Sequence, residues 1–236
     1  MKQFIFSLLI CTALFAAFQA GAQISDQLDE HASAWTLSKQ SNRVKVYTRA
    51  YENSNFNAFK AVATLNQPIS SILAVLSDAT SCPLWVDGCL RSDNLEVTNF
   101  NDRFGYSESK LPWPFKNRDL AVRILTTNPN GKHEIQIAMY TDGRLPKETG
   151  KTVHITDSES LYILRAVNNT QTDLIWMQHT EPSGNLPAWL VNSMIVNLPL
   201  KSVAALEKTA SAEKYQNAKI KYDDLGQIIG LGIENM

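Results

Sequence analysis

The chain has 236 residues, with 22 basic and 23 acidic side chains and a formal net charge of −1. This nearly equal number of basic and acidic side chains argues against a nucleic acid or another polyanion as partner. The length allows one large domain or two small ones. Because no Gly/Ser/Pro linker, repeat or low-complexity tract divides the chain, we expect a single domain over residues 23–236.

Residues 1–22 have the pattern of a secretory signal peptide. Lys2 supplies a positive start, Phe4 to Phe18 is mostly apolar, and Ala20-Gly21-Ala22 fits the small-x-small cleavage pattern. The alternative is a membrane anchor, but the apolar run is about 15 residues long and a span needs about 20. We therefore expect an exported protein, periplasmic in a bacterium rather than secreted by a eukaryote.

The first third of the mature chain predicts a mixture of helix and strand. Apolar positions at helical spacing indicate a helix from Asp26 to Lys39, capped by Ser25 or Asp26. Residues 43–48 and 56–65 are rich in β-favouring side chains and predict strands. Pro68 then begins a second helix, since its missing N–H costs nothing in a first turn. Cys82 to Gly88 predicts a short helical piece or turn.

Cys82 and Cys89 are the two cysteines that remain after residues 1–22 are removed. An exported protein meets an oxidising environment, which favours a local disulfide. The alternative is two buried free thiols, because spacing alone does not show whether the Cβ atoms lie close enough to bond.

The stretch from Leu90 to Pro182 predicts repeated short strands separated by Asn, Asp, Gly and Pro turns. Consecutive strands joined by tight turns form an antiparallel, curved sheet rather than βαβ units. The expected strands are Leu95–Phe100, Phe104–Lys110, Asp119–Thr127, His133–Tyr140, Thr152–Ile155, Ser160–Val167 and Thr172–His179.

The last third predicts one long helix, running to about Tyr215, with a stripe that must be buried on the sheet. This stripe consists of Leu190, Met194, Val196, Leu200, Val203 and Leu206.

Two motifs in this order resemble a known family. The first is the aromatic-proline clasp Leu-Pro-Trp-Pro-Phe-Lys-Asn-Arg-Asp at residues 111–119, and the second is the lead Gly-Asn-Leu-Pro-Ala-Trp-Leu-Val-Asn at residues 184–192. Over about Ser38 to Tyr215 the chain resembles START domains, the lipid-transfer domains related to steroidogenic acute regulatory protein. The resemblance implies an α+β helix-grip fold, in which a curved antiparallel sheet grips a long C-terminal helix around a hydrophobic tunnel.

Catalytic chemistry has little support in the sequence. The four histidines (His31, His133, His154 and His179) show no metal-ligand spacing. There is no Gly-x-Ser-x-Gly elbow and no phosphate-binding glycine loop. We expect no catalytic residue, no metal and no cofactor.

A tunnel for an amphiphile needs apolar walls and a few placed polar groups. The large side chains that could supply the walls, each of which could instead be an ordinary core residue, are Trp85, Tyr106, Trp113, Phe115, Met139, Tyr162 and Trp176.

Arg118 is the expected contact for a polar head group. It follows the clasp and enters a strand, and a buried guanidinium must be paired or bind a polar group. The resemblance supports this role, because similar positions in START relatives often hold a charged or polar group near the ligand. The alternative is a salt bridge at the rim with Asp119 or Glu108.

The family's terminal helix contributes to the cavity roof, which implies that some of Trp189, Asn192, Ser193 and Val196 face the ligand. Asn192 and Ser193 could instead satisfy backbone groups near the helix start.

The leading interpretation is a protein that binds, and could transport, a lipid or other hydrophobic small molecule, with transient contact to a membrane. The first alternative is an enzyme, a cyclase or hydrolase acting in the same tunnel, which would show paired acid and base side chains in the cavity. The second is an interaction module, which would show a filled core and an exposed apolar patch.

Overall fold

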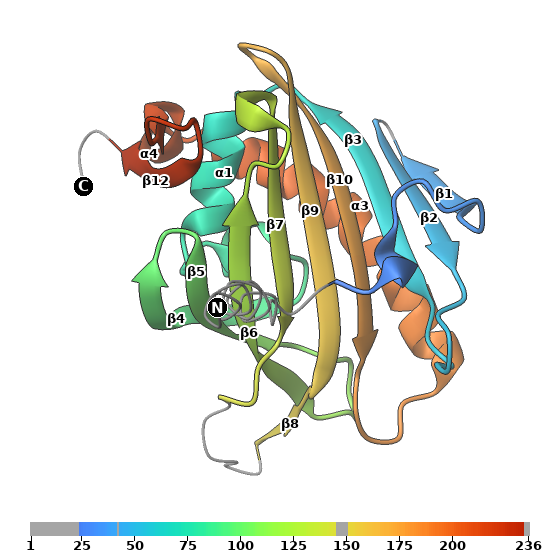
Figure 1. The fold of residues 1–236 in the computed structure, drawn as a ribbon. Helices are drawn as coiled ribbons and strands as arrows, with labels where there is room; N and C mark the ends of the chain where they lie inside the picture. The colour runs from blue at the N-terminus through green and yellow to red at the C-terminus, as the bar shows by residue number, and fades with distance from the viewer. Residues whose placement is uncertain (1–23, 42, 145–150, 234–236) are drawn as a thin grey trace, which may run out of the picture.

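The computed structural model describes residues 24–41, 43–144 and 151–233, so the expected signal peptide, residues 1–22, lies outside the described residues. Within them, ten strands form one large curved sheet (Figure 1). The strands are β1 (Thr36–Ser41), β2 (Val44–Arg49), β3 (Ala58–Leu65), β4 (Cys89–Asn99), β5 (Asp102–Ser109), β6 (Asn117–Thr127), β7 (Glu134–Thr141), β8 (Thr152–His154), β9 (Asp157–Asn168) and β10 (Gln171–Glu181).

The order of strands across this sheet is β1-β2-β3-β10-β9-β7-β6-β5-β4. Every neighbouring pair in that path is antiparallel, as the tight turns predict. β8 pairs parallel to the start of β6, beyond the segment of β6 that β7 reaches. Each of the seven expected strands from Leu95 to His179 overlaps an observed one. β10 pairs with β3, which brings the early and late halves of the chain together.

The helices are α1 (Ile69–Ser77), α2 (Cys82–Trp85), α3 (Ala188–Ala210) and α4 (Glu213–Gln216), with 3₁₀ turns η1 (Asp26–Leu28) and η2 (Gly131–His133). Figure 1 shows α1 and α3 on the same side of the sheet. α1 begins directly after Pro68, as predicted, and its residues Ser71–Leu76 are buried. The core lies between this helical layer and the sheet.

α3 is the long helix expected near the C-terminus, but it ends at Ala210, before the short helix α4. Val203 and Leu206 are buried as predicted, whereas the four earlier stripe residues are only partly covered. By length and composition alone α3 could also cross a membrane. In this fold it packs on α1, α2 and the strands β1, β2 and β3.

The expected helix from Asp26 to Lys39 is wrong. Only η1 is helical, and Thr36–Ser41 forms β1 at the edge of the sheet, paired with β2. Tertiary contacts override the helical spacing: the Ser25 hydroxyl donates to Glu159 (2.5 Å) instead of capping a helix. The indole of Trp35 lies beneath the Lys60 ammonium, 5.1 Å from its ring centroid.

A C-terminal hairpin was not predicted. β11 (Ala218–Tyr222) pairs antiparallel with β12 (Ile228–Ile233) across a turn that contains Gly226 at φ +77°. Ala218 and Ile228 are buried in the main core. The packed unit therefore extends beyond Tyr215, where the expected core ended.

Candidate binding cavity

The described residues surround a cavity of about 220 Å³ between the helical layer and the sheet. Its walls come from the end of α1, from α2, from the strands β4 to β7, β9 and β10, and from a single residue of α3, Leu198. The large apolar and aromatic residues in this lining are Leu76, Trp85, Tyr106, Leu120, Val122, Ile124, Met139, Tyr162, Trp176 and Leu198.

Three aromatic rings form the innermost wall. Tyr162 and Trp176 stack with centroids 5.1 Å apart, and Trp85 meets both edge-on at 6.4 and 5.9 Å. These arrangements are the favoured ones for aromatic quadrupoles. Burial raises the pKa of the Tyr162 hydroxyl above its ordinary value, so this side chain stays neutral. This aromatic part of the wall is therefore uncharged.

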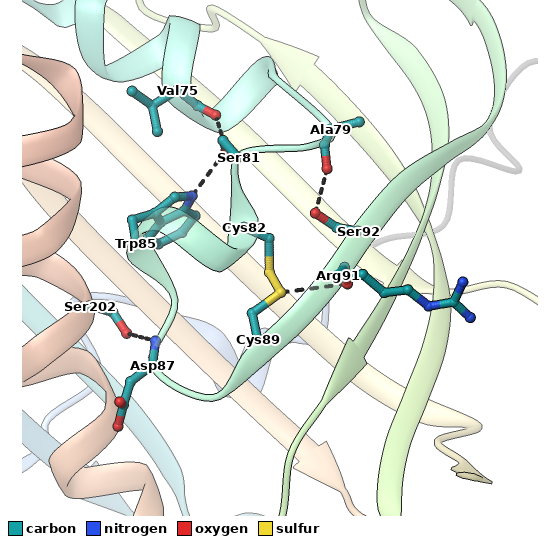
Figure 2. The surroundings of a disulfide bond; sticks show 10 residues. All are labelled: Val75, Ala79, Ser81, Cys82, Trp85, Asp87, Cys89, Arg91, Ser92 and Ser202. Carbon is teal, nitrogen blue, oxygen red and sulfur yellow. Dashed lines mark hydrogen bonds between the residues drawn. A yellow bond between two sulfur atoms is a disulfide. The ribbon is translucent and has the colours of Figure 1, made fainter. Parts of the chain in front are cut away.

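Cys82 and Cys89 form a disulfide, with Cα atoms 6.0 Å apart, which joins α2 to the start of β4 (Figure 2). Cys82 and Cys89 are therefore bonded to each other and are not two free thiols. The cross-link closes a short loop that contains Trp85, whose side chain lines the cavity.

Hydrogen bonds around the disulfide hold Trp85 in place (Figure 2). The Trp85 indole donates to the Ser81 hydroxyl (3.2 Å), which itself donates to the carbonyl of Val75 (2.7 Å). The backbone N–H of Asp87 donates to Ser202 of α3 (3.0 Å). α2 is therefore fixed to both helices that cover the sheet.

Four of the residues expected to bind ligand lie in the cavity wall: Trp85, Tyr106, Met139 and Tyr162. Trp176, expected as a wall residue, lies there as well. Their contact with a ligand stays a prediction, since no bound molecule is present.

Arg118, the expected head-group contact, lies outside the cavity lining. Arg118 is buried, 4% exposed. Its guanidinium donates to the backbone carbonyls of Pro182 (2.5 Å), Lys116 (2.6 Å) and Ser183 (2.8 Å). Neither alternative partner, Asp119 or Glu108, pairs with it. The guanidinium therefore satisfies backbone carbonyls of the loop that leads into α3.

The start of α3 does not form the roof of the cavity. Trp189, Asn192, Ser193 and Val196 are absent from its lining, and Trp189 is 73% exposed. Asn192 instead accepts the backbone N–H of Asn57 (2.9 Å), in line with the backbone-satisfying alternative. Because α3 crosses the sheet obliquely, only its middle reaches the cavity, at Leu198.

The clasp also lies apart from the cavity lining. The Trp113 side chain is 92% exposed, and Phe115, which is half-buried, does not reach the lining either. The clasp is instead joined through Arg118 to the α3 lead, where Gly184 adopts φ +68° and a Cβ at that position would lie 3.5 Å from Arg118 Nη2.

Arg103 is the cavity residue that sequence reasoning missed. It is 5% exposed and lines the cavity, and its Nη1 donates to the carbonyl of Ser77 (3.0 Å). Burial lowers the pKa of its guanidinium from the ordinary value. The available signal was its position on the inward face of β5, two residues before Gly105.

A polar network lies behind Tyr106. Its hydroxyl donates to Asp119 Oδ2 (3.0 Å), and Asp119 Oδ1 contacts His154 Nδ1 (2.5 Å). Burial, then the neighbouring Asp119, raises the pKa of Tyr106. Neither Asp119 nor His154 lines the cavity. In the described ranges no group of three His, Cys, Asp or Glu side chains could hold a metal ion.

The curved antiparallel sheet, the long C-terminal helix and the largely apolar cavity between them define a helix-grip protein. The START domain family matches residues 16–208, most of the chain. The chain therefore belongs to the START domain family, whose members bind lipids or other hydrophobic ligands. The resemblance to START domains that the clasp and the lead indicated is confirmed.

Bacterial and animal proteins are similar to this chain. The crystal structure of a STAR-related lipid transfer protein from Xanthomonas axonopodis is 26% identical, with a TM-score of 0.69, covering 76% of this chain and 99% of that one. An uncharacterised protein of Pseudomonas aeruginosa is 26% identical over 179 residues, 76% of this chain and 88% of its own length. Mouse START domain-containing protein 10 is 22% identical over 80% of this chain, which spans 64% of that relative.

Proposed function

We propose that this protein binds one hydrophobic small molecule or lipid in the cavity between α2 and the sheet and carries it through an aqueous compartment. The observation that carries the proposal is the cavity with the aromatic wall of Trp85, Tyr162 and Trp176. Such a lining, largely apolar with a few polar groups, is the usual form of a small-molecule site.

The cavity volume limits the size of the ligand. An apolar cavity of about 150 Å³ takes a benzene-sized molecule. At about 220 Å³, this cavity takes a small ring system or part of a single acyl chain. A lipid with two acyl chains would require α2 and α3 to move apart.

Transport of this kind needs no input of chemical energy. Burial of each ligand CH₂ yields about 0.8 kcal/mol against water, but a membrane offers nearly the same burial. The ligand therefore exchanges between the two without a large free-energy difference. The protein's contribution is to shield the ligand from water between membranes.

Export to the periplasm is part of the proposal. The signal-like residues 1–22 support it, and so does the Cys82–Cys89 disulfide, because disulfides persist mainly in oxidising compartments. The mass of the protein recovered from a periplasmic extract checks this point, since cleavage after Ala22 leaves a chain that begins at Gln23.

An enzymatic function has less support from the geometry. An enzyme would need an acid and base pair directed into the cavity. Of the two carboxylates in the lining, Asp78 is bonded to Lys214 and Tyr215 and Asp93 is exposed to solvent. Tyr106 directs its hydroxyl at Asp119, behind the wall. The interaction-module alternative requires a filled core, and the cavity counts against it.

The first prediction concerns this cavity. Val122 lines it, so V122F places a ring in the ligand's space, whereas Val97 is exposed on β4 and V97F adds the same ring outside. Native mass spectrometry after incubation with a lipid extract should show a stoichiometric adduct for the wild type and V97F, with about tenfold or greater loss of occupancy for V122F. The absence of any adduct on the wild type, or equal occupancy of folded V122F, would overturn the proposal.

A further inference from the structure

Arg103 carries a charge that no other described residue neutralises. Its side chain is 5% exposed, and its Nε and Nη2 atoms are buried without a hydrogen-bond partner among the described residues. Its recorded contacts are the Nη1 bond to the Ser77 carbonyl and the Phe100 ring, whose centroid lies 5.4 Å away. Neither is an anion. A buried guanidinium is normally paired, because removing it from water without a partner is costly.

None of the acidic side chains nearest along the chain or in the cavity lining pairs with Arg103. Asp78, next to Ser77, accepts from Lys214 (2.6 Å) and Tyr215 (2.8 Å). Asp102 accepts two bonds from Arg123. Asp93, also in the lining, is exposed to solvent. Burial is the one cause that shifts the pKa of Arg103, with no carboxylate opposing it.

The two unpaired atoms of Arg103 lie on one edge of the guanidinium. Nε–H and Nη2–H project in parallel, and this edge matches the two oxygens of a carboxylate. The neighbouring strand shows the same match: Arg123 donates from Nε (2.8 Å) and Nη2 (2.6 Å) to the two carboxylate oxygens of Asp102. Ser77, whose carbonyl already holds Arg103, has an unpartnered buried hydroxyl that could add a third bond.

We propose that the ligand is an amphiphile with one carboxylate group, and that Arg103 binds this carboxylate while the aromatic wall covers the apolar body. The Arg103 side chain rotates to present its Nε/Nη2 edge to the cavity that it lines. This inference rests on the proposed function and names its ligand class. The cavity volume of about 220 Å³ accommodates a small-ring acid, or the carboxylate end and part of the chain of a single-chain acid, rather than a lipid with two acyl chains.

The test compares probes that differ in the head group alone: dodecanoate, 1-dodecanol and dodecyl phosphate, titrated calorimetrically into the wild type, R103M and R123M. Methionine keeps an unbranched apolar side chain in place of the arginine stem. Arg123 is the matched control because it lies on the adjacent strand, does not line the cavity and already has Asp102 as its partner.

The wild type and R123M should bind dodecanoate about tenfold or more tightly than 1-dodecanol, since a charge-assisted hydrogen bond contributes at least that ratio. R103M should bind the two probes equally. R103M should also unfold at the same or a higher temperature than the wild type without ligand, because it removes an unpaired buried charge. A purely structural arginine would instead lower the unfolding temperature and leave the ratio unchanged.

The outcomes separate this inference from the proposed function. Equal affinity of the wild type for dodecanoate and 1-dodecanol would overturn the role of Arg103 and leave a hydrophobic carrier. Tighter binding of dodecyl phosphate than of dodecanoate would overturn the carboxylate in favour of a phosphate monoester. Binding of none of these probes, nor of a lipid extract, would overturn both the inference and the proposed function.

Discussion

Two buried arginines of this protein have opposite environments. Arg118 donates to three backbone carbonyls outside the cavity, whereas Arg103 keeps two donors unpaired in the cavity wall. Sequence context favoured Arg118, because it follows the aromatic clasp. The difference arises from partners that are distant in sequence, such as the Pro182 and Ser183 carbonyls.

Replacement of Arg118 should therefore affect stability rather than ligand selectivity. We expect R118M to lower the free energy of unfolding by about 2–4 kcal/mol, because it leaves buried carbonyls without their charged donor. Urea unfolding measures this loss. R91M is the control, since Arg91 is exposed and solvent screens its bridge to Glu108. An R118M protein of wild-type stability with altered head-group selectivity would restore the ligand-binding role.

At the scale of elements, Asp78 joins the end of α1 to α4. It caps α1 and accepts hydrogen bonds from Thr80, Lys214 and Tyr215. Burial by itself would raise the pKa of Asp78, but the bonds from Lys214, Thr80 and Tyr215 outweigh it and lower the pKa to about 2. The carboxylate form is therefore the one that holds the two helices together.

The pH dependence follows from the sign of this shift. A carboxyl whose pKa is lower in the folded state contributes stability above its unfolded pKa of 3.8, and that stability is lost as the pH falls toward about 2. We expect D78N to cost about 1 kcal/mol at pH 7, because solvent screens part of the interaction of this partly exposed carboxylate, and progressively less below pH of about 4. Thermal unfolding across this range measures the difference, with D87N, at an exposed bridge to Lys201, as control. A D78N deficit that stayed constant down to pH of about 2 would contradict the assignment.

At the scale of the whole molecule, two exposed tryptophans lie outside the cavity, in segments that Arg118 joins. Trp113 belongs to the clasp and Trp189 to the first turn of α3, and both are mostly exposed. Tryptophan is enriched where proteins meet the interfacial region of a membrane. We propose these side chains as the site of transient membrane contact.

The double variant W113A/W189A should slow delivery of dodecanoate to lipid vesicles severalfold, because it removes the interfacial side chains, and should leave equilibrium binding unchanged. Stopped-flow fluorescence with a labelled dodecanoate measures the transfer rate. L225A, at an exposed position in the C-terminal hairpin, controls for loss of surface apolar area. Transfer at the wild-type rate by the double variant would place membrane contact elsewhere.

Much of the fold was predictable from short stretches of the sequence. Turn residues between β-favouring runs located the strands from β4 to β10, and Pro68 located α1, because these signals act within a few residues. The helix predicted from Asp26 to Lys39 does not form, because Ser25 and Trp35 contact residues that are distant in sequence. These residues are Glu159 and Lys60. The β11–β12 hairpin was missed because its alternation is short and interrupted by glycines.

Periodicity and turns in the sequence by themselves determined a domain with an antiparallel sheet and a long terminal helix, because these signals are local. The resemblance of the two motifs added the family and its helix-grip fold. Only the tertiary structure decided which polar groups reach the cavity. Arg103 and Arg118 both lie on strands of one sheet, and the strand register and the loop before α3 decide which of them has its Nε and Nη2 donors paired. The Arg118 bonds to Pro182 and Ser183 span 64 and 65 residues of chain, and no local pattern encodes them.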